Sequence, residues 1–112
     1  MGYDLHNKYG DYFCATVASW DFLLDIARKH GWEPSGTLAP EFNEGGETSA
    51  FDRANWAGGY FSNDFQRVSD NDARNIAVAL RKALKTDKFS HEREQFIRHF
   101  TAYCQNGSFE IW

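Results

Sequence analysis

The residues best suited to chemistry are aromatic and polar side chains in the middle of the chain. They are Trp32, Trp56, Tyr60, Asn63 and Asp64. Aromatic rings beside hydrogen-bonding groups suit a sugar, a flat ligand or the hot spot of a protein interface. In a small domain such rings also commonly cap an open end of the core. Core capping is therefore the favoured interpretation of these rings, and they are also the residues at which we predict any ligand-binding or partner-binding site.

A cysteine nucleophile is the most specific enzymatic hypothesis, because Cys104 could meet His99 or His30 in space. Cys104, however, lies on the apolar stripe of a predicted helix, where burial raises the pKa of a thiol and makes it inert. The first residues of the chain lack a secretion signal, so we expect Cys14 and Cys104 to be reduced and packed. We therefore predict no catalytic residue.

Metal and nucleotide sites are not predicted. The four histidines are His6, His30, His91 and His99. They show no H-x-x-x-H spacing, and neither cysteine belongs to a C-x-x-C pair. A calcium loop ending at Asp72 would need oxygen ligands where Phe61 and Phe65 stand. No glycine-rich phosphate-binding pattern occurs either, and we expect no cofactor.

Charge and hydropathy disfavour some classes of partner. A formal charge of −4 argues against non-specific binding to nucleic acid or to an anionic membrane, both of which need a basic surface. A weaker hypothesis places nucleic acid on a basic stripe: Arg74, Arg81, Lys82, Lys85 and Lys88. No apolar run approaches the roughly 20 residues of a membrane span, so we expect a cytoplasmic protein.

The clearest structural signal is a helix over residues 70–84. Ser69 and Asp72 have the spacing of a capping box, in which each side chain takes up backbone N–H groups of the first turn. The following apolar residues recur on one helical face: Ala73, Ile76, Ala77, Leu80, Ala83 and Leu84. This face is predicted to form a wall of the core.

Two further helices flank this one. The first is predicted from about Trp20 to His30, with Gly31 in the position of a left-handed cap. The other is predicted to begin after Ser90 and to end at Asn106-Gly107. Its buried stripe should comprise Phe96, Ile97, Phe100, Tyr103 and Cys104.

Short alternating segments predict strands at Gly2–Leu5 and Phe109–Trp112, which could pair with each other or with a strand from Trp56 to Phe61. Tyr12–Val17 is compatible with either an extended segment or the approach to a helix. The predicted fold is therefore α+β, with about three helices packed on a small sheet formed by the termini and part of the middle segment. We expect a single domain over residues 1–112.

The sequence also resembles a family of short uncharacterised bacterial proteins, a domain of unknown function. The residues that carry the resemblance are Gly31-Trp32 with Pro34 and Gly36-Thr37, Tyr60-Phe61-Ser62-Asn63-Asp64, Val68-Ser69 with Asp72-Ala73 and Ala79-Leu80, and Phe109-Glu110-Ile111-Trp112. The resemblance implies a single small bacterial domain. It implies no activity, so no catalytic residue is transferred from it.

Small size, acidity, surplus aromatic residues and the missing catalytic set favour binding over catalysis. The first hypothesis is a protein-interaction module, such as an accessory or immunity-like inhibitor, with a protein partner of unknown identity. The second is a small ligand-binding protein or enzyme that uses a pocket from Trp56 to Asp64.

Overall fold

The computed structural model describes residues 2–38, 59–61 and 66–112. These residues form, in order, β1 (Gly2–Asn7), β2 (Tyr12–Thr16), α1 (Val17–Lys29), β3 (Gln66–Val68), α2 (Asp70–Thr86), α3 (His91–Gln105) and β4 (Phe109–Ile111). The strands make one antiparallel sheet in the order β2-β1-β4-β3. Three helices with a small sheet of terminal and middle strands confirm the predicted α+β fold.

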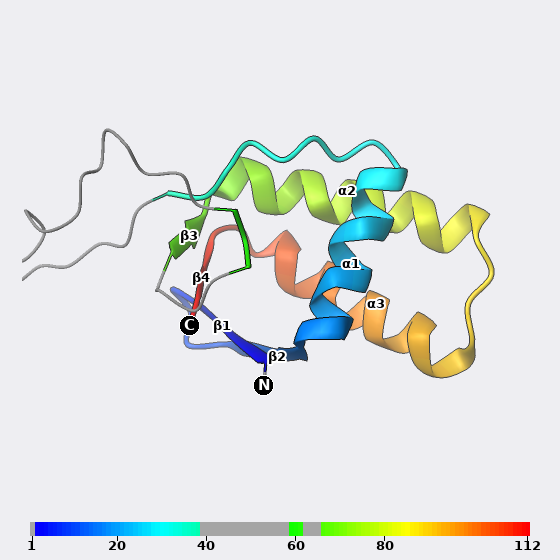
Figure 1. The fold of residues 1–112 in the computed structure, drawn as a ribbon, viewed down its shortest axis with the longest axis horizontal. Helices are drawn as coiled ribbons and strands as arrows, with labels where there is room; N and C mark the ends of the chain where they lie inside the picture. Colours follow the sequence, from blue (N-terminus) through cyan, green and yellow to red (C-terminus); the bar gives the residue numbers. More distant parts are fainter. Residues whose placement is uncertain (1, 39–58, 62–65) are drawn as a thin grey trace, which may run out of the picture.

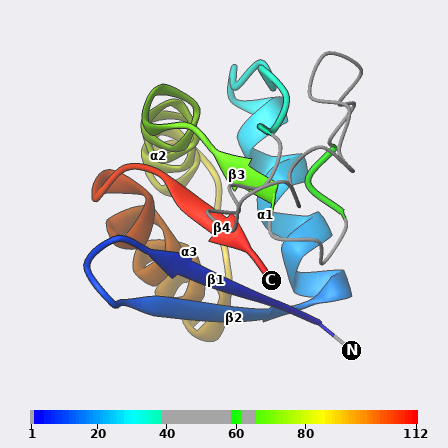
Figure 2. The ribbon, with the colours of Figure 1, turned by 90° about the vertical axis from the view of Figure 1, so that its left-hand side faces the viewer.

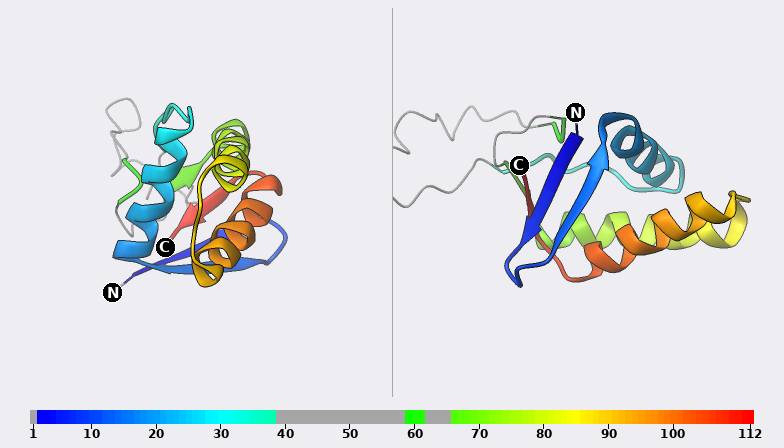
Figure 3. Two further views of the ribbon diagram at one scale, coloured as in Figure 1. Left: turned by 90° about the vertical axis from the view of Figure 1, so that its right-hand side faces the viewer. Right: turned by 90° about the horizontal axis from the view of Figure 1, so that it is seen from below.

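The fold has two layers, and the three described helices lie on the same face of the sheet (Figure 1, Figure 3). Side chains alternate along each strand, so one face of the sheet turns towards the helices. The strand residues buried on that inner face include Tyr3, Leu5, Val68, Phe109 and Ile111. The core of the described chain therefore lies between the sheet and the helices.

Helix α2 begins where the sequence predicted. The Ser69 Oγ accepts a hydrogen bond from the Asp72 N–H at 3.1 Å, and the helix continues to Thr86. Five residues of the predicted apolar stripe are buried: Ala73, Ile76, Ala77, Leu80 and Ala83. Full burial of a side chain such as Ile76 or Leu80 stabilises the fold by about 1.5–3 kcal/mol. Packing of this stripe is thus a main source of the helix's stability.

Helix α1 begins at Val17, three residues before the predicted start at Trp20. The prediction relied on the apolar period, which begins only at Trp20, and so it missed the capping residue at Thr16. Thr16 has an extended backbone, and its Oγ1 accepts a hydrogen bond from the Ser19 N–H at 3.1 Å. Thr16 therefore ends β2 and also caps the first turn of the helix.

At the other end of α1, Gly31 has a φ of +103°, as expected for the left-handed position after a helix.

Helix α3 confirms both predicted ends. The Ser90 Oγ accepts from the Arg93 N–H at 3.3 Å, and the chain leaves the helix at Gly107 with a φ of +98°. Ile97 and Phe100 are completely buried against the core. None of the described helices has the length and apolar character needed to cross a membrane.

The middle strand differs from its prediction. Half of the range Trp56–Phe61, residues 56–58, lies outside the described residues, and the part from Gly59 to Phe61 is not a strand. The sheet instead uses β3, which directly precedes the cap of α2 and pairs with β4. Leu38 adds an isolated bridge on the far side of Arg67, with backbone N···O distances of 2.7 and 2.9 Å. The sequence did not reveal β3 because the polar Gln66 occupies one of its two buried positions, so no apolar alternation appears.

Aromatic rings fill the centre of the core. Trp20 and Phe100 are completely buried and meet edge to face, with ring centroids 5.5 Å apart. Phe109 meets Phe100 in the same manner at 6.3 Å. Each such pair contributes about 0.5–1.5 kcal/mol beyond its burial. Packing of aromatic rings in the core thus accounts for part of the high aromatic content of the chain.

Candidate interaction surface

Two residues of the predicted aromatic cluster lie in the interior. Trp32 is 3% exposed and Tyr60 is 2% exposed, and their rings meet edge to face at 5.3 Å. The Trp32 Nε1–H donates to Asp72 Oδ1 at 2.8 Å, and the Tyr60 hydroxyl donates to Asp72 Oδ2. The polar atoms of both rings are therefore engaged within the fold, and neither ring presents a surface to a ligand.

The other three members of that cluster are not placed. Trp56, Asn63 and Asp64 lie outside the described residues. The predicted binding site from Trp56 to Asp64 therefore stays a prediction, and only its two buried members have a structural account.

Asp72 has a role that differs from the predicted one. The capping-box pattern predicted that its carboxylate would take up a backbone N–H of the first turn. The structure instead buries the side chain completely and directs both oxygens to Trp32 and Tyr60. These partners are 40 and 12 residues away in the sequence, so local spacing did not reveal them. The carboxylate therefore links α2 to Trp32, which precedes residues 39–58, and to Tyr60, which follows them.

Tyr60 is the centre of this buried network. It has a φ of +76°, a left-handed conformation that few residues other than glycine adopt. Its carbonyl accepts from the Trp20 Nε1–H at 2.8 Å, and its hydroxyl oxygen accepts from the Gly36 N–H at 3.0 Å. Burial, and then the hydrogen bond to Asp72, raises the pKa of Tyr60 far above its ordinary value. The phenol is therefore a neutral structural group.

The two thiols have different environments. Cys104 is completely buried, as predicted, and burial raises its pKa well above the ordinary value. Cys14 was predicted to be packed, but it is exposed on β2, since even-numbered residues of that strand point away from the core. Its Sγ lies 3.0 Å from Asp4 Oδ1, and this hydrogen bond is the main reason that its pKa is raised. Neither thiol has the lowered pKa of a cysteine nucleophile.

Candidate metal ligands do not gather in the described ranges. No group of three or more His, Cys, Asp or Glu side chains is close enough there to hold an ion. His30 instead contacts the Asp87 carboxylate at 2.8 Å, which joins the end of α1 to the end of α2.

The outer face of the sheet carries the most distinctive arrangement of side chains. Strand pairing places Tyr12 opposite His6, His6 opposite Glu110, Glu110 opposite Arg67, and Arg67 opposite Leu38. These five residues, named here the outer row, cross the whole sheet on the side away from the helices. No described helix covers that side, which faces the viewer in Figure 2. The outer row is therefore a continuous surface feature of the described chain.

Aromatic side chains dominate one end of this surface. Trp112 follows β4 and pairs through its backbone with Asp4 of β1, with N···O distances of 2.7 and 3.3 Å. Its ring stacks on His6 with centroids 3.8 Å apart, and its Nε1–H donates to Glu110 Oε1 at 3.0 Å. Tyr12 is 68% exposed and Trp112 is 42% exposed. Large rings held in place but open to solvent are typical of interaction surfaces.

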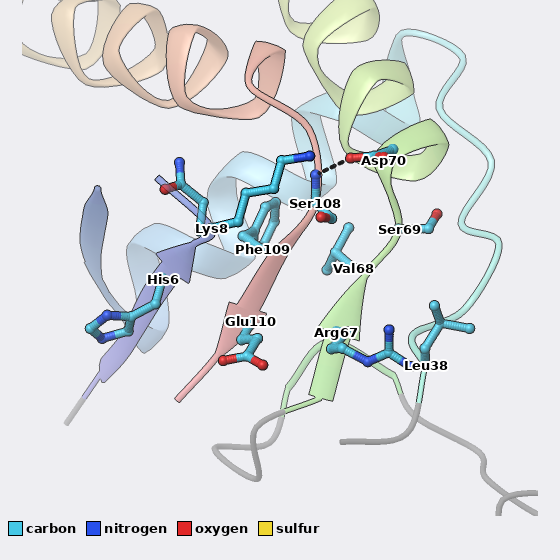
Figure 4. Close-up of a pocket in the computed structure, with 11 residues that line it drawn as sticks. His6, Lys8, Leu38, Arg67, Val68, Ser69, Asp70, Ser108, Phe109 and Glu110 are labelled. Carbon is cyan, nitrogen blue, oxygen red and sulfur yellow. Dashed lines mark hydrogen bonds between the residues drawn. The ribbon is translucent and has the colours of Figure 1, made fainter. Parts of the chain in front are cut away.

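The other end of the surface is hollowed. A cavity of about 470 Å³ lies above β4 and is lined by His6, Asn7, Lys8, Leu38, Arg67, Val68, Ser69, Asp70, Ser108, Phe109 and Glu110. Figure 4 shows His6 and Lys8 on one side of β4, with Arg67 and Leu38 on the other. Asp70 closes the upper end, where its Oδ1 accepts from the Ser108 N–H at 2.7 Å.

Charges of both signs surround this cavity. Lys8 and Arg67 bring positive charge, and Asp70 and Glu110 bring negative charge. The Ser108 N–H is the main cause of the lowered pKa of Asp70, with Lys8 contributing less. A mixed set of charges does not favour a polyanion, which is bound by a surface of one sign. It is suited to a protein surface that presents both signs.

The outer face could have been anticipated only in part from the sequence. The alternation of Phe109 and Ile111 with Glu110 and Trp112 already separated two faces of β4. The missing information was the register, because which residues meet across strands depends on pairings between distant segments.

Comparison of the chain with protein-family models, with curated proteins and with solved structures finds no match. The resemblance to a bacterial family therefore stays a prediction. We infer function from the residues and their geometry alone.

Proposed function

We propose that this chain is a protein-interaction module that binds a partner protein through the outer face of its sheet and performs no catalysis. The outer row, with Trp112 stacked on it, is the observation that supports the proposal. The row spans all four strands, and no described helix packs on it. This surface combines exposed aromatic rings with charged groups, and aromatic residues and arginine are enriched at protein interfaces.

The partner that fits best is a protein of net positive charge whose binding surface presents both signs. The chain has a formal charge of −4, and two acidic residues lie on the outer face: Asp4, opposite Cys14, and Glu110, opposite His6. Opposite net charge accelerates association and disfavours acidic partners. Lys8 would pair with an acidic group of the partner and thereby help to set its orientation. We propose the class of an accessory or immunity-like inhibitor, and we keep the expectation of a bacterial, cytoplasmic protein as part of this proposal.

Affinity capture with two matched surface variants tests the proposal. The first carries Trp112→Ala and Leu38→Ser on the outer face, where both side chains are partly exposed. The control carries Val78→Ala and Lys82→Ala on the exposed side of α2. Circular dichroism and thermal melting establish that each variant is folded.

The proposal predicts a stoichiometric partner that the native chain and the α2 variant both retain. The outer-face variant should lose at least about tenfold in affinity, since loss of one interface hot spot costs about 2 kcal/mol or more. Capture should also weaken at high salt. Recovery of no stoichiometric partner, or equal recovery with both variants, would contradict the proposal.

A further inference from the structure

The two edges of the sheet are not equivalent. The β3 edge is closed by the chain itself, because Leu38 and Arg67 exchange both backbone hydrogen bonds. The β2 edge is bordered by no described segment, and Figure 2 shows β2 as the outermost strand on that side. An unpaired edge is a template on which another strand can add.

The register identifies the backbone groups that this edge offers. The Asn7 N–H donates to the Asp11 carbonyl at 3.1 Å, and antiparallel pairs alternate between bonded and non-bonded. Odd-numbered residues of β2 therefore bond to β1. Tyr12, Cys14 and Thr16 point their N–H groups away from the sheet. The Thr16 carbonyl is directed into α1 as part of its cap, whereas the carbonyls of Tyr12 and Cys14 remain available to a new strand.

Strand β2 lacks the features that normally protect an edge. Its sequence, Tyr-Phe-Cys-Ala-Thr, contains no charge, no proline and no glycine, and its pairing with β1 is continuous without a bulge. Protected edges carry lysine, proline or bulges that prevent pairing. The strand also begins with Tyr12, which is 68% exposed. This edge is therefore competent to pair.

We propose that the strand added to this edge is β2 of a second copy, antiparallel, with a two-fold axis at Cys14. This register pairs all five residues of the strand, whereas a shift in either direction leaves residues unpaired. It places each large side chain opposite a small one, Tyr12 against Thr16 and Phe13 against Ala15. A shift centred on Phe13 would bring that bulky side chain against its own copy. The strand is thus complementary to itself in size, and no like charges oppose each other within it.

The dimer formed in this way has a closed, two-fold interface. Cys14 of each copy exchanges two hydrogen bonds with its counterpart, and each Thr16 N–H reaches the Tyr12 carbonyl of the other copy. The two sheets become continuous, and the helices of both copies lie on the same side. Both outer faces stay open in this dimer and lie side by side. This inference does not depend on the proposed function.

Sedimentation of the purified chain under reducing conditions tests the dimer. The native chain and Cys14→Ser should show a concentration-dependent monomer–dimer equilibrium. Cys14→Lys is the discriminating variant. In the monomer the new lysine lies opposite Asp4 on β1, which favours the fold, but in the dimer it lies opposite its own copy. We expect a folded monomer for Cys14→Lys. A native chain that stays monomeric at about 0.5 mM, where a dimer with a micromolar dissociation constant would be almost fully formed, overturns the proposal.

Oxidation by diamide, which takes up the two thiol hydrogens as the disulfide forms, tests the register. Directly opposed residues of a bonded antiparallel pair have Cα atoms about 5.5 Å apart, within the range that a disulfide spans. The native chain should therefore yield a covalent dimer through Cys14. The control is Tyr9→Cys in a Cys14→Ser background, since position 9 is exposed at the hairpin tip but far from the axis. Equal cross-linking of the control refutes the register.

Discussion

Removal of the Asp72 carboxylate should destabilise the fold far more than its place in the first turn of a helix implies. In Asp72→Ala the Trp32 Nε1–H and the Tyr60 hydroxyl would both remain buried without an acceptor. Each buried donor left in this state costs about 1–3 kcal/mol. The expected loss in the free energy of unfolding is therefore about 2–6 kcal/mol, a large part of the roughly 5–15 kcal/mol of a small domain.

Urea denaturation followed by circular dichroism measures this loss. The matched control is Asn71→Ala, one residue earlier on the same turn but exposed, which should change stability by no more than about 0.5 kcal/mol. A double-mutant cycle with Trp32→Phe should show coupling of about 0.5–3 kcal/mol, because one hydrogen bond joins the two side chains. A loss below about 1 kcal/mol for Asp72→Ala would refute the reasoning that both donors depend on it.

Three further predictions concern the ends of helices and the thiols. The hydrogen bond from His30 is the main cause of the lowered pKa of Asp87, so the ionised carboxylate stabilises the fold above the ordinary carboxyl pKa of about 4, and this stability is lost as the pH falls. In Asp87→Asn the melting temperature should therefore depend less on pH over that acidic range. An unchanged dependence on pH would contradict this. Gly107→Ala should lower the free energy of unfolding by about 1–2 kcal/mol, because a φ of +98° disfavours a side chain. The new Cβ would also lie 2.4 Å from Asp70 Oδ1. Calorimetry that finds no decrease in stability would refute this prediction. Native-state labelling with a disulfide reagent should modify Cys14 but modify Cys104 only after unfolding, and equal rates would show that the burial assigned to Cys104 is wrong.

The sequence predicted best those features that depend on neighbouring residues. Ser69 and Ser90 act on N–H groups within the next turn, so their spacing alone located the starts of α2 and α3. The start of α1 was misplaced because Thr16 belongs both to a strand and to a cap, while the apolar period began only at Trp20. Strand β3 was missed because the buried Gln66 is polar, whereas β4 has Phe109 and Ile111 at its buried positions.

The candidate site was predictable to a smaller extent, since it depends on contacts between distant segments. The residue types of Trp32 and Tyr60 marked them as candidates for a site. The sequence did not show that both side chains donate hydrogen bonds to the buried Asp72 carboxylate. The outer row requires the register of every strand pair, which no single segment encodes. The alternation in the sequence nevertheless separated Glu110 and Trp112 from the buried residues of β4, and this is the part of the outer face that could be predicted.

Hydroxyl-radical footprinting of the chain, free and in complex with the partner recovered by affinity capture, tests most directly where binding occurs. Trp112 and His6, which are stacked on the outer face, should be strongly protected in the complex. His99, exposed on α3, should be oxidised equally in both states. Protection of His99 together with unchanged oxidation of Trp112 would place the partner on the helices and contradict the proposed role of the outer face.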